Sequence, residues 1–475
     1  MANETAIDTR KAAAEAAIAT ATGEAPLVAP APAWKAPPSW LPRTFHALAY
    51  RDFVFLWLGQ ITNSLGMWID MVARPILVLM VTGSALQMGL IVAVRGIPML
   101  FLQPIAGVAA DRFDRRMVML CIKSLSLLVN FAFAFIILSG QLELWHIYAT
   151  AIAKSVLQAF DTPARNALLP SLVPPHLLIN AIGLNSGSMQ LVRTISGGVA
   201  GISIALFTIL GQRLSLGAEY FGMGATYMLA AVFYALAVAL TYKLQVPPEG
   251  RVARSEENWV SSLVDGFRFA AQSQPILGVF VLLVVRSTFG MPYMSVFVPL
   301  IAMQVMDFGF LSTVGLADPE RQGEVGLGLM LSVSGIGGVA GTFVIVTIGE
   351  GLRRKGLWIL VAQLAFGAAM VALGLTSLLP AVVLPFLSVA ALGLGQSIVM
   401  PVKNAVLLEQ SPNEMRGRVL GLQGLDRGFA SLGGMFSGFA AAAIGGPLAL
   451  ALFGVLCVVG TLAVGALCTG LRRVE

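Results

Sequence analysis

Gly107-Val-Ala-Ala-Asp111-Arg112-Phe-Asp-Arg115-Arg116 is a short, strongly charged stretch that lies between two long apolar segments, 86–110 and 117–139. Charge at such a junction costs little only where it lies in water at a membrane surface. Its glycine lets two helices approach closely, its aspartate can cap or pair across a helix end, and its arginines favour the cytoplasmic side. The stretch therefore predicts a cytoplasmic loop between two membrane-spanning helices.

The composition is that of a membrane protein. Hydrophobic residues make up 57% of the 475 residues and charged residues only 11%, whereas a soluble domain carries about 25% charge. Long apolar stretches recur along the chain and predict an all-α membrane protein in a lipid bilayer. The net charge of +6 lies in short loops, so nucleic acid is not expected as a partner. The three cysteines lie in apolar stretches without metal-ligand spacing, and we expect neither a metal nor another cofactor.

Twelve transmembrane helices are predicted after a tail, residues 1–42, whose Ala-, Pro- and Thr-rich composition indicates disorder rather than a signal peptide. The predicted spans are 53–81, 86–110, 117–139, 144–164, 177–208, 221–243, 276–304, 325–349, 357–379, 381–407, 417–443 and 446–470. Lys and Arg gather in the even-numbered connections, whereas the odd-numbered ones carry essentially Arg213 and Arg321. The positive-inside rule therefore predicts that both termini are cytoplasmic.

A repeated motif divides the spans into two halves. Gln-x4-Pro-x-(Arg or Lys)-Asn-Ala-x-Leu occurs at 158–169 and again at 396–407, an offset of 396 − 158 = 238 residues. The same offset relates Arg115-Arg116 to Arg353-Arg354. Internal repeats of this kind are a common transporter architecture. We expect a cytoplasmic tail at 1–42, an N-terminal bundle at 43–244, a linker with an amphipathic surface helix at 245–274 and a C-terminal bundle at 275–475.

The charged loop resembles the loop between the second and third helices of the major facilitator superfamily, Gly-x-x-x-Asp-Arg-x-Gly-Arg-Arg. The matching residues are Gly107, Asp111, Arg112, Arg115 and Arg116. Asp114 stands where the family has its second glycine. The resemblance implies two six-helix halves, with this loop as a cytoplasmic latch between them. We accordingly expect gating contacts from the loop and from a second cytoplasmic set, Glu350, Arg353, Arg354, Arg416 and Arg418.

Further stretches resemble one branch of that superfamily, the efflux permeases that include the enterobactin exporter and macrolide-efflux-type proteins. They are 53–60 (Phe-x-x-Leu-Trp-Leu-Gly-Gln), 82–85 (Thr-Gly-Ser-Ala), 161–170 (Asp-Thr-Pro-Ala-Arg-Asn-Ala-Leu-Leu-Pro) and 414–419 (Glu-Met-Arg-Gly-Arg-Val). The branch often has an aspartate just after the glycine of the first span, whereas here that position is Met67 and the acid is Asp70. The resemblance implies export of a small organic molecule, siderophore- or drug-like, without identifying it.

The first predicted span carries a polar stripe. Its members, at spacings of 3, 4, 3 and 4, are Gln60, Asn63, Met67, Asp70 and Arg74. They share one helix face, which should point at the protein interior or a water-filled cavity because lipid-exposed charge is costly. Asp70 and Arg74 form an i, i+4 pair, which is either a structural ion pair or a site where protonation of Asp70 frees Arg74 to bind an anion.

Four more cations lie deep in predicted spans: Arg95, Lys154, Arg193 and Arg286. Arg95 is expected to pair with Asp70, to line the substrate path, or to do both. If the deep cations share one cavity, that cavity is positive and concentrates anions. We therefore predict an anionic small-molecule substrate. The predicted substrate-binding residues are Gln60, Asn63, Arg74, Arg95, Lys154, Arg193, Arg286 and Tyr293.

Four remaining charged positions are less informative. Asp161 and Arg165 lie near the predicted cytoplasmic mouth, where they form either a gating contact or a solvated helix cap. Lys123 lies about 10 Å into the third span and is expected to snorkel to the surface without a role. Asp426, in the eleventh span, is a less deep acid that needs a partner on another helix.

The expected energy source is an ion or substrate gradient, because the sequence has no Gly-x4-Gly-Lys-Ser/Thr motif. No triad, metal cluster or acid pair points to an enzyme. We predict a monomeric exporter in a bacterial inner membrane that works by alternating access and by proton antiport through Asp70. The alternatives are an uptake symporter for an organic anion, and a sensor or assembly protein that kept the fold.

Overall fold

The computed structural model describes residues 42–112, 114–214, 220–245, 267–314, 318–348, 354–412 and 425–472, with Pro38, Met415, Val419 and Val474. Most of the predicted disordered tail and most of the predicted linker helix lie outside the described residues. Four predicted gating residues lie outside them as well: Glu350, Arg353, Arg416 and Arg418.

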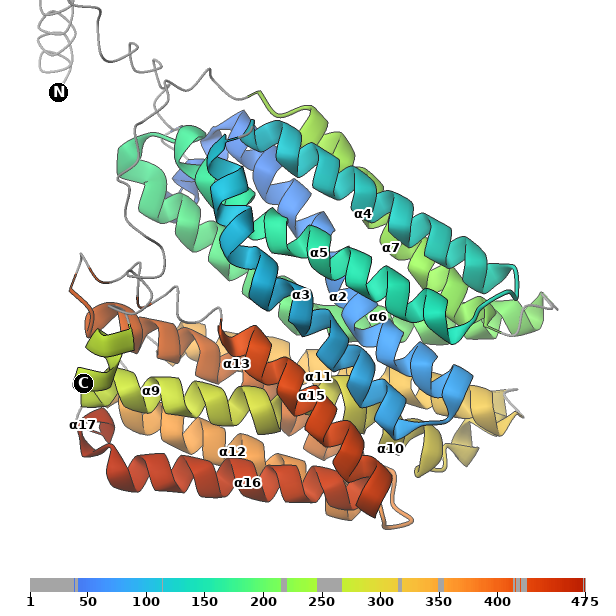
Figure 1. The fold of residues 1–475 in the computed structure, drawn as a ribbon. Coiled ribbons are helices and arrows are strands. Elements are labelled where there is room, and N and C mark those ends of the chain that lie inside the picture. Colours follow the sequence, from blue (N-terminus) through green and yellow to red (C-terminus); the bar gives the residue numbers. More distant parts are fainter. Residues whose placement is uncertain are drawn as a thin grey trace, which may run out of the picture.

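Six helices form the first bundle, drawn in blue to green in Figure 1. They are α2 (Arg51–Thr82), α3 (Ala85–Arg112), α4 (Arg115–Leu138), α5 (Leu144–Leu168), α6 (Leu178–Arg213) and α7 (Phe221–Tyr242). Short 3-10 turns precede α2 at Arg43–Ala49 and lie between α5 and α6 at Leu169–Ser171 and Pro175–Leu177. The first six predicted spans are therefore confirmed within a few residues at each end.

Asp114 sets where α4 begins. Its side chain accepts a hydrogen bond from the backbone N–H of Met117 at 2.9 Å, as an N-cap residue does. Helix α3 runs on to Arg112, so the predicted loop is a tight turn between two helices. The aspartate that replaces a glycine in the motif therefore has a structural use of its own.

The second bundle, drawn in yellow to red in Figure 1, contains the remaining helices. They are α9 (Gln274–Val285), α10 (Val298–Gln304), α11 (Pro319–Ile348), α12 (Lys355–Thr376), α13 (Val383–Glu409), α15 (Leu425–Ile444), α16 (Gly446–Leu467) and the short α17 (Thr469–Arg472). A 3-10 turn at Gly309–Val314 precedes α11.

The seventh span, predicted over 276–304, is confirmed at Gln274–Gln304, but it is not one regular α-helix. Two π-helical turns, Arg286–Gly290 and Tyr293–Phe297, lie between α9 and α10, with Pro292 at their junction. The apolar pattern of a span does not reveal such turns, which often occur at functional sites. Two predicted site residues, Arg286 and Tyr293, begin the two turns.

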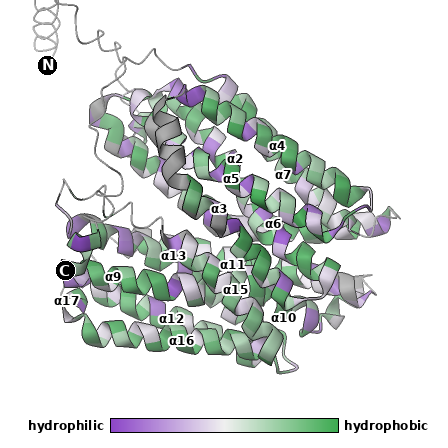
Figure 2. Cartoon of the chain, viewed as in Figure 1, coloured by the Kyte–Doolittle hydropathy of each residue, from purple (hydrophilic) through white to green (hydrophobic). Residues whose placement is uncertain are grey.

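The helices of both bundles consist largely of hydrophobic residues, drawn in green in Figure 2. Large side chains such as Phe101, Phe135 and Phe343 are mostly exposed, which is favourable only against lipid. Within the described part of the chain, nine helices are long and apolar enough to cross a membrane. Helices α3 and α15 add shorter apolar stretches, at Ala85–Gly96 and Gly428–Ile444. The protein is a multi-pass, all-helical membrane protein.

The two bundles meet at the end of the molecule where α2 ends and α3 begins. Helix α3 crosses α15 at Gly89 and Gly438, and α6 crosses α11 at Gly201 and Gly328, where a Cβ atom would overlap the opposite backbone. Thr208 Oγ1 donates a hydrogen bond to Glu324 Oε2 across the second crossing, at 2.6 Å. At the other end, where α2 and α9 begin, the ribbons of the two bundles lie farther apart (Figure 1).

Candidate transport site

A buried ion pair lies inside the first bundle. Asp70 and Arg74 on α2 are both fully buried, and Asp70 Oδ1 accepts hydrogen bonds from Arg74 Nη2 at 2.6 Å and from Nε at 3.1 Å. Arg74 Nη1 donates to the backbone oxygen of Ile147 at 2.8 Å and to the hydroxyl of Thr150 at 2.7 Å. The Phe133 ring lies 4.8 Å from its guanidinium carbon.

In this conformation the donors of Arg74 are directed at the protein interior, and it does not line any of the three cavities described below. Binding of an anion by Arg74 after protonation of Asp70 stays a prediction. The periodic stripe on α2 correctly predicted an inward face. It could not indicate which members of that face reach a cavity and which lie behind its wall.

The second oxygen of Asp70 faces two further cations. Arg95 Nη2 on α3 lies 3.3 Å from Asp70 Oδ2, and Lys154 Nζ on α5 lies 4.0 Å from it. Lys154 also donates to Asn130 Oδ1 at 2.9 Å and lies 4.3 Å from the centre of the Tyr234 ring. At an effective dielectric constant of 20, each such pair attracts by roughly 4 kcal/mol, comparable to the several kcal/mol that burial of one ion costs. All three cations therefore contribute to stabilising the ionised form of Asp70 in the protein interior.

Arg95 and Lys154 also line a cavity of about 80 Å³ in the first bundle. The other predicted site residues on its wall are Gln60, Asn63, Asp161 and Arg165. Asp161 and Arg165 are both buried, so a solvated helix cap is ruled out for them in this conformation. Among the described residues, Gln60 Oε1, Asp161 Oδ1 and Arg165 Nε have no hydrogen-bond partner. The cavity thus offers polar atoms that a substrate could bind.

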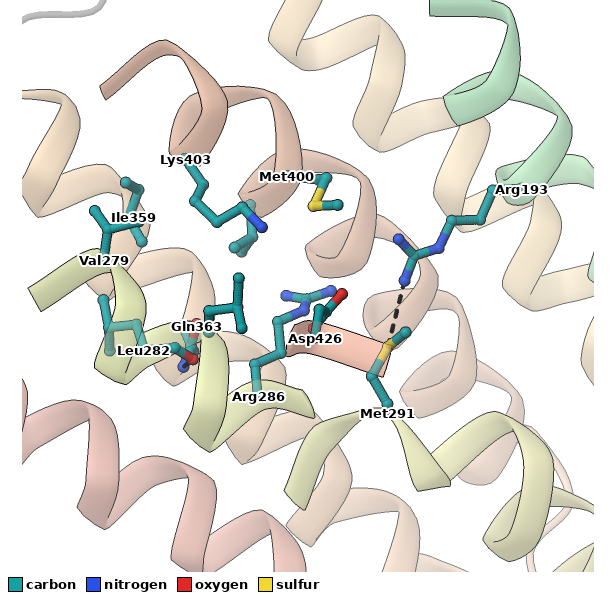
Figure 3. A pocket seen from close by; sticks show the side chains of 12 residues that line it. Arg193, Val279, Leu282, Arg286, Met291, Ile359, Gln363, Met400, Lys403 and Asp426 are labelled. Carbon is teal, nitrogen blue, oxygen red and sulfur yellow. Dashed lines mark hydrogen bonds between the residues drawn. The ribbon is translucent and has the colours of Figure 1, made fainter. Parts of the chain in front are cut away.

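A second cavity, of about 20 Å³, lies between the bundles (Figure 3). Arg286, Asp426 and Lys403 point into it from the second bundle, and Arg193 on α6 approaches from the first. Asp426 accepts a hydrogen bond from the hydroxyl of Ser287. Lys403 was not among the predicted binding residues, although its place in the repeat, equivalent to Arg165, was a usable signal.

Arg286 and Tyr293 are held by α12 and α13. The guanidinium carbon of Arg286 lies 4.8 Å from the centre of the Phe366 ring, and its Nη2 donates to the backbone oxygen of Gln396 at 3.5 Å. The Tyr293 hydroxyl donates to Gln396 Oε1 at 2.6 Å. Arg286 Nη1 has no hydrogen-bond partner among the described residues. Because the π-helical turns begin at these two residues, they direct both side chains towards α13.

Arg193 connects the two bundles. Its Nη2 donates to the Met291 sulfur at 3.3 Å, and its guanidinium carbon lies 5.5 Å from the centre of the Trp68 ring. It lines the second cavity and also a third cavity, of about 20 Å³, beside Trp68 and Tyr293. Met189 of the first cavity lies one helical turn from Arg193 on α6, so one helix face joins the cavities.

Both walls carry an excess of positive charge. The first cavity has three cations and one acid: Arg95, Lys154, Arg165 and Asp161. The second has the same ratio: Arg193, Arg286, Lys403 and Asp426. The net formal charge of each lining set is therefore 3 − 1 = +2. A positive, low-dielectric cleft concentrates anions.

The predicted latch residues are only partly described. Gly107, Asp111 and Arg112 belong to the last turns of α3, but the side chains of Asp111 and Arg112 lie outside the described part of the structure. Arg115 begins α4, and Arg116 Nη2 donates to the backbone oxygen of Tyr242 in the same bundle at 2.6 Å. Arg354, in a left-handed conformation with φ of 60°, precedes α12. A latch between the halves stays a prediction.

One expectation about a lysine was wrong. Lys123 does not snorkel to the surface; its side chain is fully buried and donates to the Thr241 hydroxyl at 2.9 Å. Its depth along α4 was predictable, but the direction in which it points depends on how α4 packs against α7.

Comparisons with known proteins agree with this architecture. Residues 56–425 match the model of the Major Facilitator Superfamily. The chain is 22% identical over 398 residues to a staphyloferrin A transporter of Staphylococcus aureus, covering 82% of this chain and 90% of that protein. It is 25% identical over 384 residues to an enterobactin exporter of Escherichia coli, covering 81% and 83% of the two chains. With macrolide efflux protein A of Streptococcus pyogenes it shares 25% identity over 252 residues, 53% of this chain, and it spans only 57% of the length of that relative.

Solved structures show the same fold. The nucleoside transporter NupG superposes with a TM-score of 0.64 at 15% identity, covering 87% of this chain and 99% of that one. A POT family transporter in complex with 5-aminolevulinic acid superposes with a TM-score of 0.67 at 12% identity, covering 89% and 97%. This family consists of transporters and not of enzymes. The chain therefore belongs to the Major Facilitator Superfamily and is a secondary transporter.

Proposed function

We propose that this transporter exports a small organic anion from a bacterial cytoplasm in exchange for protons, as a monomer working by alternating access. The observation that carries the proposal is the threefold excess of cations on both cavity walls. The names of the relatives, a macrolide efflux protein and an enterobactin exporter among them, support the direction. Basic residues where α4 and α12 begin support cytoplasmic termini.

In this proposal, the anion binds Arg95 and Lys154 on the first wall and Arg193 and Arg286 on the second. Contact between the bundles at one end and their separation at the other correspond to one state of an alternating-access cycle. Loss of a hydrogen bond to a charged group costs about 1.5–3 kcal/mol, which is roughly a 10- to 100-fold loss of affinity. Glutamine in place of any one of these four cations should therefore weaken binding by that factor.

Asp70 is proposed as the coupling residue because it lies within 4.0 Å of two of the three cations of the first cavity, Arg95 and Lys154. The ionised carboxylate holds Arg95 and Lys154 in place, 3.3 and 4.0 Å away, and so preorganises the anion site. Protonation removes the negative charge that these cations share with Arg74. Their mutual repulsion then favours a different arrangement. Proton and substrate would in this way occupy the protein in alternate states, as exchange requires.

Proton–anion symport is the second candidate, and one observation favours it. A bound anion would compete with Asp70 for Arg95 and Lys154, and a carboxylate that loses its cations takes up a proton more readily. Competition for the cations would couple anion binding to proton uptake by Asp70, as symport requires. Preorganisation would couple anion binding to proton release, as exchange requires. The direction of proton movement therefore separates the two mechanisms.

Proteoliposomes test the proposal directly. Naphthalene-2-sulfonate is a suitable probe because it stays ionised and does not cross lipid as a neutral acid. Exchange predicts its accumulation in vesicles with an acidic lumen, and symport predicts accumulation in vesicles with an alkaline lumen. Protein-free liposomes and Arg286→Gln provide the controls. Absence of accumulation under either gradient, together with absence of counterflow, would refute anion transport.

A further inference from the structure

Methionines line each of the three cavities described above. They are Met67 and Met189 in the first, Met291 and Met400 in the second, and Met71, Met291 and Met294 in the third. In every case they lie on a wall that also carries an arginine or lysine. Flexible, polarizable thioethers pack against apolar bodies of different shapes, and they are common at surfaces that accept varied ligands.

Three polar groups on these walls donate hydrogen bonds to methionine sulfur. Arg193 Nη2 donates to Met291, the Ser64 hydroxyl donates to Met189 at 3.4 Å, and Gln158 Nε2 donates to Met67. Thioether sulfur is a weak acceptor. An oxygen atom of a ligand could therefore replace it as the acceptor at little cost and with a net gain.

Unused donors and aromatic rings lie next to these methionines. Arg193 Nε and Arg286 Nη1 have no hydrogen-bond partner within the described residues. Trp68 and Tyr234 already stack against cations, at 5.5 Å from Arg193 and 4.3 Å from Lys154. A substrate ring would find both aromatic faces and sulfur contacts beside a positive charge.

We infer that the substrate is an amphiphilic anion: a strongly anionic group attached to an apolar, aromatic body. The cavity cations bind its oxygen atoms, which replace the sulfur acceptors, and the methionines surround its body. This inference rests on the proposed function and names the substrate class for the same site. A sugar-like body would leave its hydroxyl groups against thioethers without hydrogen bonds, which is costly. Several bodies of similar size are accepted, because each methionine can change its rotamer.

Equilibrium binding to the purified full-length chain tests this inference with three probes. Naphthalene-2-sulfonate and isethionate carry the same charged group on an aromatic and on a polar body, and 2-naphthol carries the ring without the charge. Burial of the ring should make naphthalene-2-sulfonate bind on the order of 10- to 100-fold tighter than isethionate, and tighter than 2-naphthol. Equal affinity of the two sulfonates would overturn the inference and leave anion transport intact. Equal affinity of naphthalene-2-sulfonate and 2-naphthol would overturn both.

Variants of Met291, which lines two cavities, test the role of the methionines. Met291→Ser should lower the affinity for naphthalene-2-sulfonate about 5- to 10-fold more than that for isethionate, whereas Met291→Leu should keep most of the difference. Met117→Ser is the matched control, because Met117 is 58% exposed on the outer surface of α4. An unchanged ratio of the two affinities in Met291→Ser, or an equal loss for both sulfonates, would contradict the inference.

Discussion

The two halves hold charge in different ways. In the first, Asp70 is fully buried and lies within 4.0 Å of three cations from three different helices. In the second, Asp426 accepts a hydrogen bond from Ser287 and shares an interfacial cavity with Arg286 and Lys403. The first cluster is closed around Asp70, although its three cations and one acid leave a formal charge of 3 − 1 = +2, whereas the second is open and leaves Arg286 Nη1 without a hydrogen-bond partner among the described residues. A closed cluster suits a switch, and an open one suits capture of a ligand.

The largest expected effect is loss of the Asp70 carboxylate. Asp70→Asn leaves Arg74 buried without a counter-charge and should lower the free energy of unfolding by about 3–5 kcal/mol. Combining it with Arg74→Gln should restore much of that loss, because the two changes remove opposite charges. Thermal unfolding in detergent measures both. Asp426→Asn is the comparison, and the contrast between the halves breaks down if that variant is destabilised as strongly as Asp70→Asn.

A change in the open cluster should affect binding and not stability. Arg286→Gln removes a cation that faces a cavity, so the affinity for naphthalene-2-sulfonate should fall roughly 10- to 100-fold, with unfolding changed by about 1 kcal/mol or less. Arg74→Gln should show the reverse pattern. Titration and thermal unfolding of the two purified variants decide this. The interpretation of Arg286 as a ligand-binding residue is wrong if its substitution destabilises the protein and leaves affinity unchanged.

Lys403 sharpens the comparison further, since it is the repeat equivalent of Arg165 in the other half. Lys403→Gln should lower the affinity for the same probe about 3- to 10-fold, less than Arg286→Gln, because one hydrogen bond to a flexible ammonium group is lost. The measurement is the same titration, with Arg165→Gln alongside. If Lys403→Gln loses as much affinity as Arg286→Gln or more, Arg286 is not the principal cation of the second cavity.

The smallest expected effect concerns the contact between the halves. Thr208→Val removes the hydrogen bond to Glu324 and nearly preserves volume, which should favour separation of α6 from α11 by about 1 kcal/mol, or roughly 5-fold in population. Distances between spin labels placed on the exposed outer ends of α6 and α11 would report this shift. Ser332→Ala is the control, because Ser332 lies on α11 and its hydroxyl donates to the backbone oxygen of Gly328 within that helix. No difference between the two variants would mean that glycine packing alone holds this end closed.

Much of the fold was predictable because membrane spans are long and their apolar pattern is strong. The prediction of 53–81 against the observed Arg51–Thr82 is typical. The π-helical turns of the seventh span were not predictable, since Gly290 and Pro292 within Arg286–Phe297 indicate a distorted helix but not the kind of turn that results. The direction of the Lys123 side chain was missed for a related reason. Periodicity gives the face of a helix but not the helix that covers it.

The candidate site followed from depth and charge. Arg95, Lys154, Arg193 and Arg286 were singled out because a cation deep in a span is costly unless it faces a cavity or a partner, and all four line cavities. The sequence could not tell that they divide between two walls, nor that methionines lie beside them. Those features depend on how the helices pack within each half and between the halves.

The most direct test of the central claim is the proton balance of substrate binding. Naphthalene-2-sulfonate would be added to weakly buffered, purified transporter while released or absorbed protons are measured, for the wild type and for Asp70→Asn/Arg74→Gln, which removes one buried charge of each sign. If exchange proceeds through Asp70, the wild type should release protons on binding. The double variant should still bind the probe but release none. Proton uptake by the wild type, or release that persists in the variant, would contradict it.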